Sequence, residues 1–408
     1  MRSMPSIETP MNDQIDTPSK IGLVSQRNWL AAMRGDPQSG VSEYPLYSDA
    51  HITGEFVTGL GPYCFLNTVP LPSSVGTVNA PIIVRVSEHI RHIEPDMSRK
   101  NEELYHGGWY VDEIASLTSL CLGARIRAGG ETRRFDPGKD PLGRPQAWND
   151  GPRPTLHVRH NRIVLPSVVG THSLDQLAPL ATIPQLTTTQ FVSLIRACNL
   201  YQDALWTAES EPNLAWLMLV SAIETAANEF NASRGSAVER LGESKPDLAK
   251  LLESAGGNEL LTKVATMIEP SLGATKKFID FTLRFVPCEP PKRPTTEWLR
   301  VDWSAPSMKK NVLNKVYSYR SRSLHGGIPF PAPMFEPPFR LGEDPCPSEK
   351  PLTGLASHSR GATWLPDDIP INLHCFHYIT RGCLLNWWRS MAEAAVKSVN
   401  PSDGSGNC

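Results

Sequence analysis

The chain has 408 residues, of which 40% are hydrophobic and 20% are charged. It is therefore long enough and apolar enough for two domains that each bury a core. Its 40 Lys and Arg residues against 42 Asp and Glu residues give a formal charge of −2, which excludes a protein that coats nucleic acid with its whole surface and confines any RNA contact to a local basic region.

Cysteine spacing and hydropathy indicate a cytoplasmic protein. The eight cysteines include no Cys-x-x-Cys pair, which is typical of reduced thiols rather than of disulfides or a zinc site. His374 and His377 share a helix face but have no further ligand set nearby, so we expect them at the surface or in packing. The most hydrophobic stretch, 214–227, is too short to cross a membrane, and residues 1–25 lack the apolar core of a signal peptide. We expect no membrane contact, no metal and no other cofactor.

The N-terminal part of the chain alternates between short apolar runs and turn formers. Residues 1–25 are polar and are expected to be disordered. Residues 26–185 are predicted to form an α+β domain of unknown role, a sensor or specificity module. Within this domain we expect strands at 81–86, 124–128 and 156–166 and one helix at 110–123.

The C-terminal part is predicted to be mainly α-helical over 186–397. The boundary is placed where a stretch rich in Pro, Thr and Ser gives way to helical periodicity. Residues 328–370 are rich in proline and are interpreted as a long insertion, and 398–408 as a disordered tail. The expected helices lie at 189–209, 213–230, 236–254, 257–286, 305–325 and 372–397.

The helix predicted at 305–325 has clear signals at both ends and a strongly basic composition. Ser304 before Pro306 is typical of a helix start, and the Gly326-Gly327 pair is typical of a helix end. The helix contains no acidic residue, so it offers the local positive field that an RNA backbone needs. The residues predicted to bind RNA through this field are Lys309, Lys310, Lys315 and Arg322.

Arg320 lies on the apolar face of this helix. The face follows three- and four-residue spacing and consists of Leu313, Val316, Tyr317, Arg320 and Leu324. A charged group in such surroundings needs a partner, and Glu224 is the only charged residue in the apolar stripe of the helix at 213–230. We therefore predict a buried ion pair between Glu224 and Arg320. Because a buried ion pair contributes little to stability, its presence favours a functional role.

Arg320 and His325 form an Arg-x4-His motif at the end of the helix. Five positions along an α-helix rotate a side chain by roughly 140°, so the two side chains diverge on a regular helix. We expect the Gly326-Gly327 pair to let the last turn unwind and to bring the imidazole toward the guanidinium. Both groups could then contact one phosphate.

The surroundings of this motif resemble the HEPN superfamily, in particular its Apea-like group. The segment 317–327, Tyr-Ser-Tyr-Arg-Ser-Arg-Ser-Leu-His-Gly-Gly, is similar to the signature helix of that group, which ends with an aromatic residue, an Arg-Ser pair and a His-Gly pair. The apolar run 215–224 and the segment 378–385 resemble an earlier helix and the closing helix of the same group. Segments 119–125 and 140–145 resemble stretches that accompany such domains. The resemblance predicts a HEPN-like helical bundle for the C-terminal part.

The resemblance implies a metal-independent endoribonuclease, typical of defence or toxin systems. As a neutral imidazole, His325 would take the proton from the ribose 2′-OH, and Arg320 would offset the charge that builds on the phosphoryl oxygens. Ser321 could donate a further hydrogen bond, with Tyr317 and Glu224 as supporting residues. The expected product carries a 2′,3′-cyclic phosphate.

Other interpretations remain open at this point. Nuclease members often have Asn, His or Asp after the motif arginine, and this chain has Ser321. This departure and the near-neutral charge favour a catalytically silent HEPN scaffold that binds a nucleotide, RNA or a protein partner through the same groove. A third possibility is an obligate subunit whose activity needs another protein. The plainest interpretation is a salt-bridged arginine beside a histidine stabilised by the helix dipole, with Glu224 in a structural role.

The resemblance also implies a homodimer. HEPN nucleases place two signature helices across a twofold axis, so that both Arg-His pairs line one cleft. We expect the contact to use the outer apolar positions of the helix at 305–325 and the Trp387-Trp388 end of the last helix, although such an aromatic pair is also typical of a core. A protein or nucleotide trigger is a further expected partner.

Overall fold

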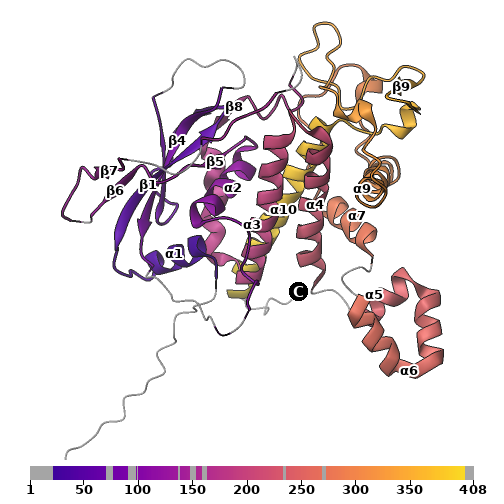
Figure 1. Ribbon diagram of the computed structural model, residues 1–408, viewed down its shortest axis with the longest axis horizontal. Coiled ribbons are helices and arrows are strands. Elements are labelled where there is room, and N and C mark those ends of the chain that lie inside the picture. The colour runs from indigo at the N-terminus through magenta and orange to yellow at the C-terminus, as the bar shows by residue number, and fades with distance from the viewer. Residues whose placement is uncertain are drawn as a thin grey trace, which may run out of the picture.

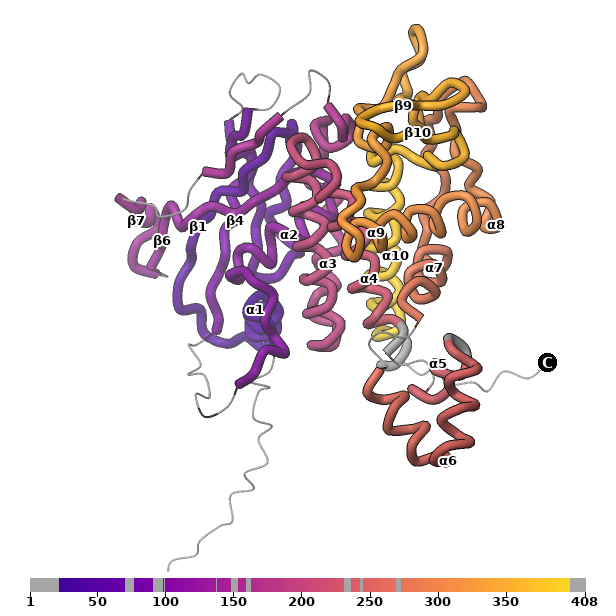
Figure 2. Tube along the Cα trace, turned by 45° about the vertical axis from the view of Figure 1, so that its right-hand side comes forward, coloured from indigo at the N-terminus to yellow at the C-terminus, as the bar shows by residue number. Residues whose placement is uncertain are grey.

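The computed structural model describes residues 22–69, 77–90, 98, 100–136, 138–147, 153–158, 163–232, 236–268 and 273–399. The expectations for the chain before residue 22 and after residue 399 lie outside these residues. An antiparallel sheet forms in the N-terminal part, and helices make up the C-terminal part (Figures 1 and 2). The expected division into an α+β part and a helical part is therefore confirmed, at this coarse level.

The main sheet is antiparallel and has the strand order β3–β4–β1–β6–β7, with β5 paired to β1 beside this path. On β4, the side chains of Ile82, Val84 and Val86 are buried, because alternate residues of a strand point to one face. A separate parallel pair joins β2 to β8. The strands are β1 (Gly40–Ser48), β2 (His51–Thr53), β3 (Tyr63–Asn67), β4 (Asn79–Glu88), β5 (Arg127–Ala128), β6 (Arg133–Phe135), β7 (Arg144–Pro145) and β8 (Thr171–Ser173).

Two expectations for the N-terminal part were wrong. Residues 159–162 of the expected strand at 156–166 lie outside the described residues, and the rest of that segment forms no strand. The backbone N–H groups of Val164 and Leu165 donate to the carboxylate of Glu209 instead of a neighbouring strand. Disorder was expected up to residue 25, but α1 (Val24–Met33) begins before it, and the Ser25 side chain is fully buried.

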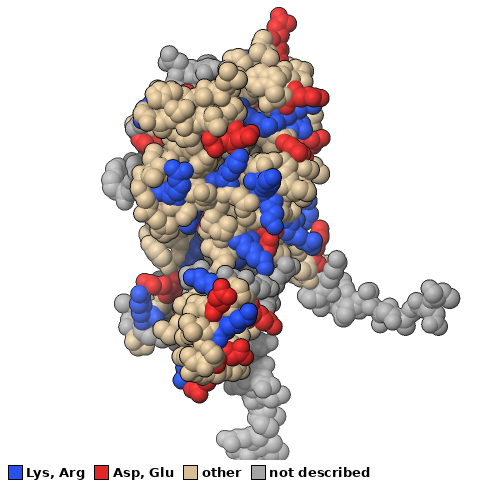
Figure 3. Space-filling view, turned by 90° about the vertical axis from the view of Figure 1, so that its right-hand side faces the viewer, with Lys and Arg blue, Asp and Glu red and all other residues tan. Residues whose placement is uncertain are grey.

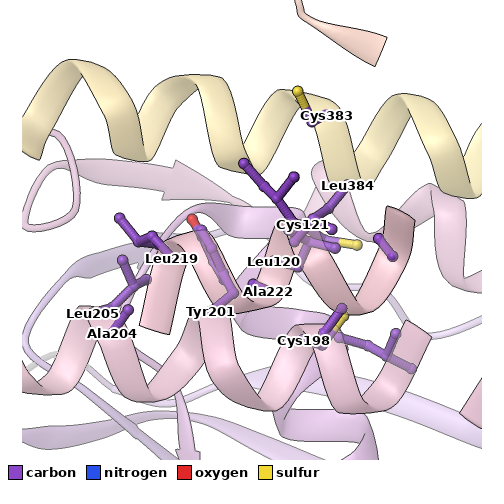
Figure 4. Close-up of a cluster of buried hydrophobic side chains, with 14 of the residues drawn as sticks. Leu120, Cys121, Cys198, Tyr201, Ala204, Leu205, Leu219, Ala222, Cys383 and Leu384 are labelled. Atoms are coloured by element: carbon purple, nitrogen blue, oxygen red, sulfur yellow. The ribbon is translucent and has the colours of Figure 1, made fainter. Parts of the chain in front are cut away.

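Five long helices build most of the remaining core. They are α2 (Tyr110–Leu122), α3 (Thr188–Thr207), α4 (Pro212–Ala232), α7 (Ala274–Phe285) and α10 (Leu373–Val399). Thr187 caps α3 in a reciprocal arrangement with Gln190. Figure 4 shows side chains of α2, α3, α4 and α10 meeting around Cys121, Tyr201 and Leu384. One continuous cluster of buried apolar side chains runs from Leu23 to Met391, so the core continues across the position where a domain boundary was expected.

The helix expected at 257–286 is interrupted. Instead α5 (Ala237–Ser244) and α6 (Pro246–Ile268) form a hairpin with its own small apolar cluster, and α7 begins only at Ala274. Helix α6 is kinked at Gly256 and Gly257, where the expected helices 236–254 and 257–286 meet. This hairpin projects from the rest of the chain in Figures 1 and 2. Residues 328–370 form no α-helix but contain two 3-10 turns and a short β-hairpin. These elements are η5 (Ala332–Phe335), β9 (Ser357–Ser359), β10 (Ala362–Trp364) and η6 (Pro366–Asp368).

The basic helix at 305–325 is present but is not uniform. It begins with α8 (Ala305–Ser307), passes through a π-helical segment, η4 (Met308–Leu313), and ends with α9 (Asn314–Gly326). Gly327 follows in the left-handed conformation, with φ +65°, so the expected glycine stop is confirmed. Within the described part of the chain, no helix is long and apolar enough to cross a membrane.

Candidate functional site

The predicted ion pair between α4 and α9 is formed. The Arg320 Nη2 donates to Glu224 Oε2 at 2.6 Å, and the Tyr317 hydroxyl donates to Glu224 Oε1 at 2.9 Å. The guanidinium also lies over the Tyr317 ring, 5.6 Å from its centroid. Burial and the Glu224 carboxylate raise the pKa of Tyr317 to about 12, so the phenol stays protonated and remains a donor. The sequence predicted a buried pair. Both side chains are in fact partly exposed, Arg320 at 19% and Glu224 at 16%.

A pocket of about 320 Å³ opens beside this ion pair. Glu224, Arg320 and Tyr317 form part of its wall, and α7 contributes Lys277. The Arg320 Nε is buried and has no hydrogen-bond partner among the described residues, while Glu224 accepts from the Nη2 of the same guanidinium. The other lining residues are Ser221, Thr225, Ala227, Asn228, Ala274 and Phe278.

Sequence reasoning missed Lys277. It precedes Phe278 on α7, and the Phe278 and Phe281 rings fix that helix in the core. The spacing of these aromatic residues indicates an amphipathic helix. It does not indicate which helix α7 contacts, because that depends on tertiary packing.

The expected position of His325 was wrong. The last turn does not unwind, because α9 stays helical through Gly326 and only Gly327 leaves the helical conformation. On this regular helix His325 is rotated by roughly 140° from Arg320; it is exposed and does not line the pocket of Glu224 and Arg320. Leu324 was expected on the apolar face, but it is 50% exposed, so that face ends at Arg320.

The other predicted RNA-binding residues are spread over the same helical segment. Lys309 and Lys310 are exposed on η4, and the Lys315 ammonium donates to the backbone carbonyl of Asp367. Arg322 lies over the Tyr319 ring at 5.7 Å, and Ser321 is half-buried. Figure 3 shows basic side chains interspersed with acidic ones on this side of the molecule. The positive field of the helix at 305–325 is therefore local and does not extend over this whole side of the molecule.

The Trp387-Trp388 pair does not provide a dimer surface. Both side chains are 1% exposed. Trp388 Nε1 donates to the Thr182 hydroxyl at 2.9 Å, and the Trp387 ring meets the Phe281 ring edge-on at 5.9 Å. The two tryptophans are therefore core residues, which was the alternative interpretation of this pair. Leu324 and Ile328, which are 50% and 48% exposed, are the apolar side chains available near His325.

Within the described residues, no group of three or more His, Cys, Asp or Glu side chains is arranged to hold a metal ion. Comparisons of the chain with protein families, with curated proteins and with solved structures gave no match. The HEPN resemblance therefore rests on the sequence segments themselves, and the function has to be argued from the site.

Proposed function

We propose that the protein is a metal-independent HEPN endoribonuclease that acts as a twofold homodimer in a defence or toxin role. Arg320 binds the phosphoryl oxygens of the RNA and offsets the charge of the transition state. His325 takes the proton from the ribose 2′-OH, which attacks the adjacent phosphorus and leaves a 2′,3′-cyclic phosphate. Ser321, next to Arg320, donates a further hydrogen bond.

The observation that carries the proposal is the way in which Arg320 is held. The Glu224 carboxylate fixes the guanidinium from one side and the Tyr317 ring supports it from another, while Lys277 adds a second cation to the same pocket. An arginine that is oriented but still has donors to spare is suited to a phosphodiester. Lys309, Lys310, Lys315 and Arg322 extend the positive field along the helix toward the flanking phosphates.

The position of His325 is the reason for placing the site between two chains. In one chain His325 lies outside the Arg320 pocket, so one motif does not supply both groups to one phosphate. A second copy related by a twofold axis brings its own His325 to the first chain's Arg320. The exposed Leu324 and Ile328 flank His325 and give such an isologous contact apolar surface.

The first experiment is an RNA cleavage assay with purified full-length chain and total RNA, with and without EDTA. Cleavage is expected to survive EDTA and to disappear in Arg320→Ala and in His325→Ala. His358→Ala is the matched control, because His358 is an exposed histidine on the β9–β10 hairpin, away from the motif. Cleavage that requires a metal, or that is equal in wild type and His325→Ala, contradicts the proposal.

The second experiment tests the shared site. Arg320→Ala and His325→Ala chains are unfolded together, refolded and assayed. If each half of the cleft takes Arg320 from one chain and His325 from the other, about half of the dimers are mixed and each has one intact Arg320–His325 combination, so about a quarter of wild-type activity returns. No recovery of activity, or a fully active monomer by light scattering, rules out the shared cleft.

A binding function is the second candidate, and the separation of His325 from the Arg320 pocket in one chain favours it. A catalytically silent scaffold would use Arg320, Lys277 and Glu224 to bind RNA, a nucleotide or a protein partner. It would bind RNA in a manner that depends on Arg320 but would not cleave it at any concentration. A filter-binding assay beside the cleavage assay separates the two functions.

A further inference from the structure

A second cavity, of about 350 Å³, lies where α10 meets the end of α2 and two proline-rich loops. Its volume is within the range of small-molecule sites. It shares no lining residue with the pocket of Glu224 and Arg320. Its charged and titratable lining includes His172, Lys292, Glu349, His374, His377 and Arg381.

Arg381 is built into this cavity. Its Nε donates to the Leu120 carbonyl at 2.9 Å, and its Nη2 donates to the Cys121 carbonyl and to Gln176 Oε1, the latter at 3.2 Å. These carbonyls end α2, where a cation is favoured by the helix dipole. Gly123 has φ +70°, and a Cβ atom there would lie 2.8 Å from the Arg381 Nε. A glycine is therefore needed both for the turn and for the close approach of the guanidinium.

The cavity has an excess of positive charge. Arg381 and Lys292 form no ion pair with any carboxylate in the described part of the chain. Glu349 is the only acid in the lining, and it is already bound to Arg293 by two hydrogen bonds of 2.7 Å and to the Val301 N–H at 2.6 Å. Two cations from different segments are thus left to face the cavity without a counter-ion.

The histidines of the cavity wall add unused hydrogen-bonding capacity. His377 is 3% exposed, and its Nε2 lies 2.6 Å from the Tyr201 hydroxyl. The Nδ1 atoms of His374 and His377 are buried and have no partner among the described residues. Because Tyr201 makes no other hydrogen bond there, either tautomer of His377 leaves one donor of this pair without an acceptor. Burial lowers the pKa of His374 to about 4, so that imidazole is neutral near pH 7.

We propose that this cavity binds a small phosphate-bearing organic molecule. Its phosphate lies between Arg381 and Lys292, because a dianion with three acceptor oxygens matches two cations from different segments. Its organic part packs against the Tyr378 ring and the three lining prolines, Pro290, Pro294 and Pro347. A carboxylate has fewer acceptor oxygens and less charge, so it matches the pair of cations less well.

Isothermal titration calorimetry of the full chain tests this, with phenyl phosphate, inorganic phosphate and benzoate as probes. Phenyl phosphate is expected to bind more tightly than inorganic phosphate, which lacks the ring, and more tightly than benzoate, which lacks the phosphate. The exposed side chain of Lys292 can be changed without disturbing the core, and Lys292→Gln should weaken phenyl phosphate roughly tenfold. Arg381→Gln should weaken it further, provided that the circular dichroism spectrum is unchanged.

Two control variants locate the binding. Arg389→Gln changes an exposed arginine on the same helix, and Arg320→Gln changes the cation of the proposed RNA site. Arg389→Gln should bind phenyl phosphate as the wild type does, and Arg320→Gln should retain the binding that Lys292→Gln weakens. The proposal is overturned if no probe binds at millimolar concentration, if benzoate binds as tightly as phenyl phosphate, if Lys292→Gln has no effect, or if Arg320→Gln alone abolishes binding. Because the readout is binding, it is independent of whether the chain cleaves RNA.

Discussion

Arg320 is held by groups of two kinds, the Glu224 carboxylate and the Tyr317 ring. Because the Glu224 and Arg320 side chains retain 16% and 19% exposure, water screens their attraction, and the pair contributes little to the stability of the fold. Its larger effect is on orientation. With the Tyr317 hydroxyl also bound to Glu224, the guanidinium has a fixed direction toward the pocket.

Substitution of Glu224 separates orientation from stability. Glu224→Gln keeps the shape and can still accept hydrogen bonds, so its melting temperature should change little, while RNA cleavage or binding should fall because the charged partner of Arg320 is gone. Glu224→Leu should also lower the free energy of unfolding by about 1–3 kcal/mol, because it leaves Arg320 and the Tyr317 hydroxyl without their acceptor. Thermal melts and cleavage assays on both variants measure this. Wild-type behaviour of Glu224→Leu in both assays would contradict the role assigned to the pair.

The residues that the sequence predicted at the site are those that break a local pattern. Glu224 and Arg320 are each a charged residue in an otherwise apolar stripe. The sequence therefore predicts that they form an ion pair with each other. Lys277 does not interrupt an apolar stripe, since it lies on the polar side of its own helix. Only the packing of α7 brings it to the pocket. The burial of His377 could not be predicted either. Its i, i+3 spacing to His374 indicates that the two histidines share a helix face but does not indicate which element covers that face.

Among the secondary-structure elements, α3 is attached to the N-terminal part by a buried arginine. Arg125 is fully buried after α2, and it donates to Asp49 at 2.7 Å, to Glu209 at 2.6 Å and to the Leu205 carbonyl at 2.7 Å. Glu209 in turn accepts from the backbone at 164–165. This network ties the loop after β1, the end of α3 and an irregular segment to one side chain.

Removing this arginine should be strongly destabilising. Arg125→Met leaves the buried carboxylates of Asp49 and Glu209 without a cation, and the free energy of unfolding should fall by roughly 3–5 kcal/mol. The matched control is Arg127→Met, two residues along, whose ion pair with Asp203 is 41% and 44% exposed and should contribute at most about 1 kcal/mol. Urea denaturation of the three proteins gives both values. A similar midpoint for the two variants would show that the buried network does not hold α3.

Helix ends were easier to predict than strands for a physical reason. The stop at Gly327 and the start of α3 depend on a few adjacent residues, so the sequence carries them locally. A strand needs a partner. The segment 156–166 has the composition of a strand, but Glu209 takes the backbone N–H groups of Val164 and Leu165. The π-helical segment η4 was also not predicted, because no capping residue or proline marks it within the helix.

Across the whole molecule, buried histidines lie where the N-terminal part, the proline-rich segment and α10 meet. Burial lowers the pKa of His377 far below its ordinary value, and the nearby His374, Arg381 and Arg125 lower it further. Burial also lowers the pKa of His172 and lowers that of His374 to about 4, with Arg340 adding to the latter shift and Glu349 opposing it. The native state therefore holds all three as neutral rings near pH 7.

These shifts predict a loss of stability in mild acid. In the unfolded chain a histidine binds a proton below about pH 6.5, whereas the buried ring of His374 resists protonation down to about pH 4. The unfolded state therefore binds more protons between these values, so the free energy of unfolding falls as the pH falls through this window and does not depend on these groups above it. Each such histidine contributes a slope of up to about 1.4 kcal/mol per pH unit.

Urea denaturation at pH 7.5 and pH 5.0 measures the effect before most carboxylates titrate. His374→Gln removes one of the three rings, so it should reduce the difference in unfolding free energy between the two pH values by on the order of 1–2 kcal/mol relative to wild type. His358→Gln, at an exposed position, should leave that difference unchanged. An equal pH dependence in wild type and His374→Gln would mean that His374 is protonated as readily in the folded chain as in the unfolded one. A phosphate-bearing ligand bound beside Arg381 and Lys292 would then meet a charged imidazole below about pH 6.5.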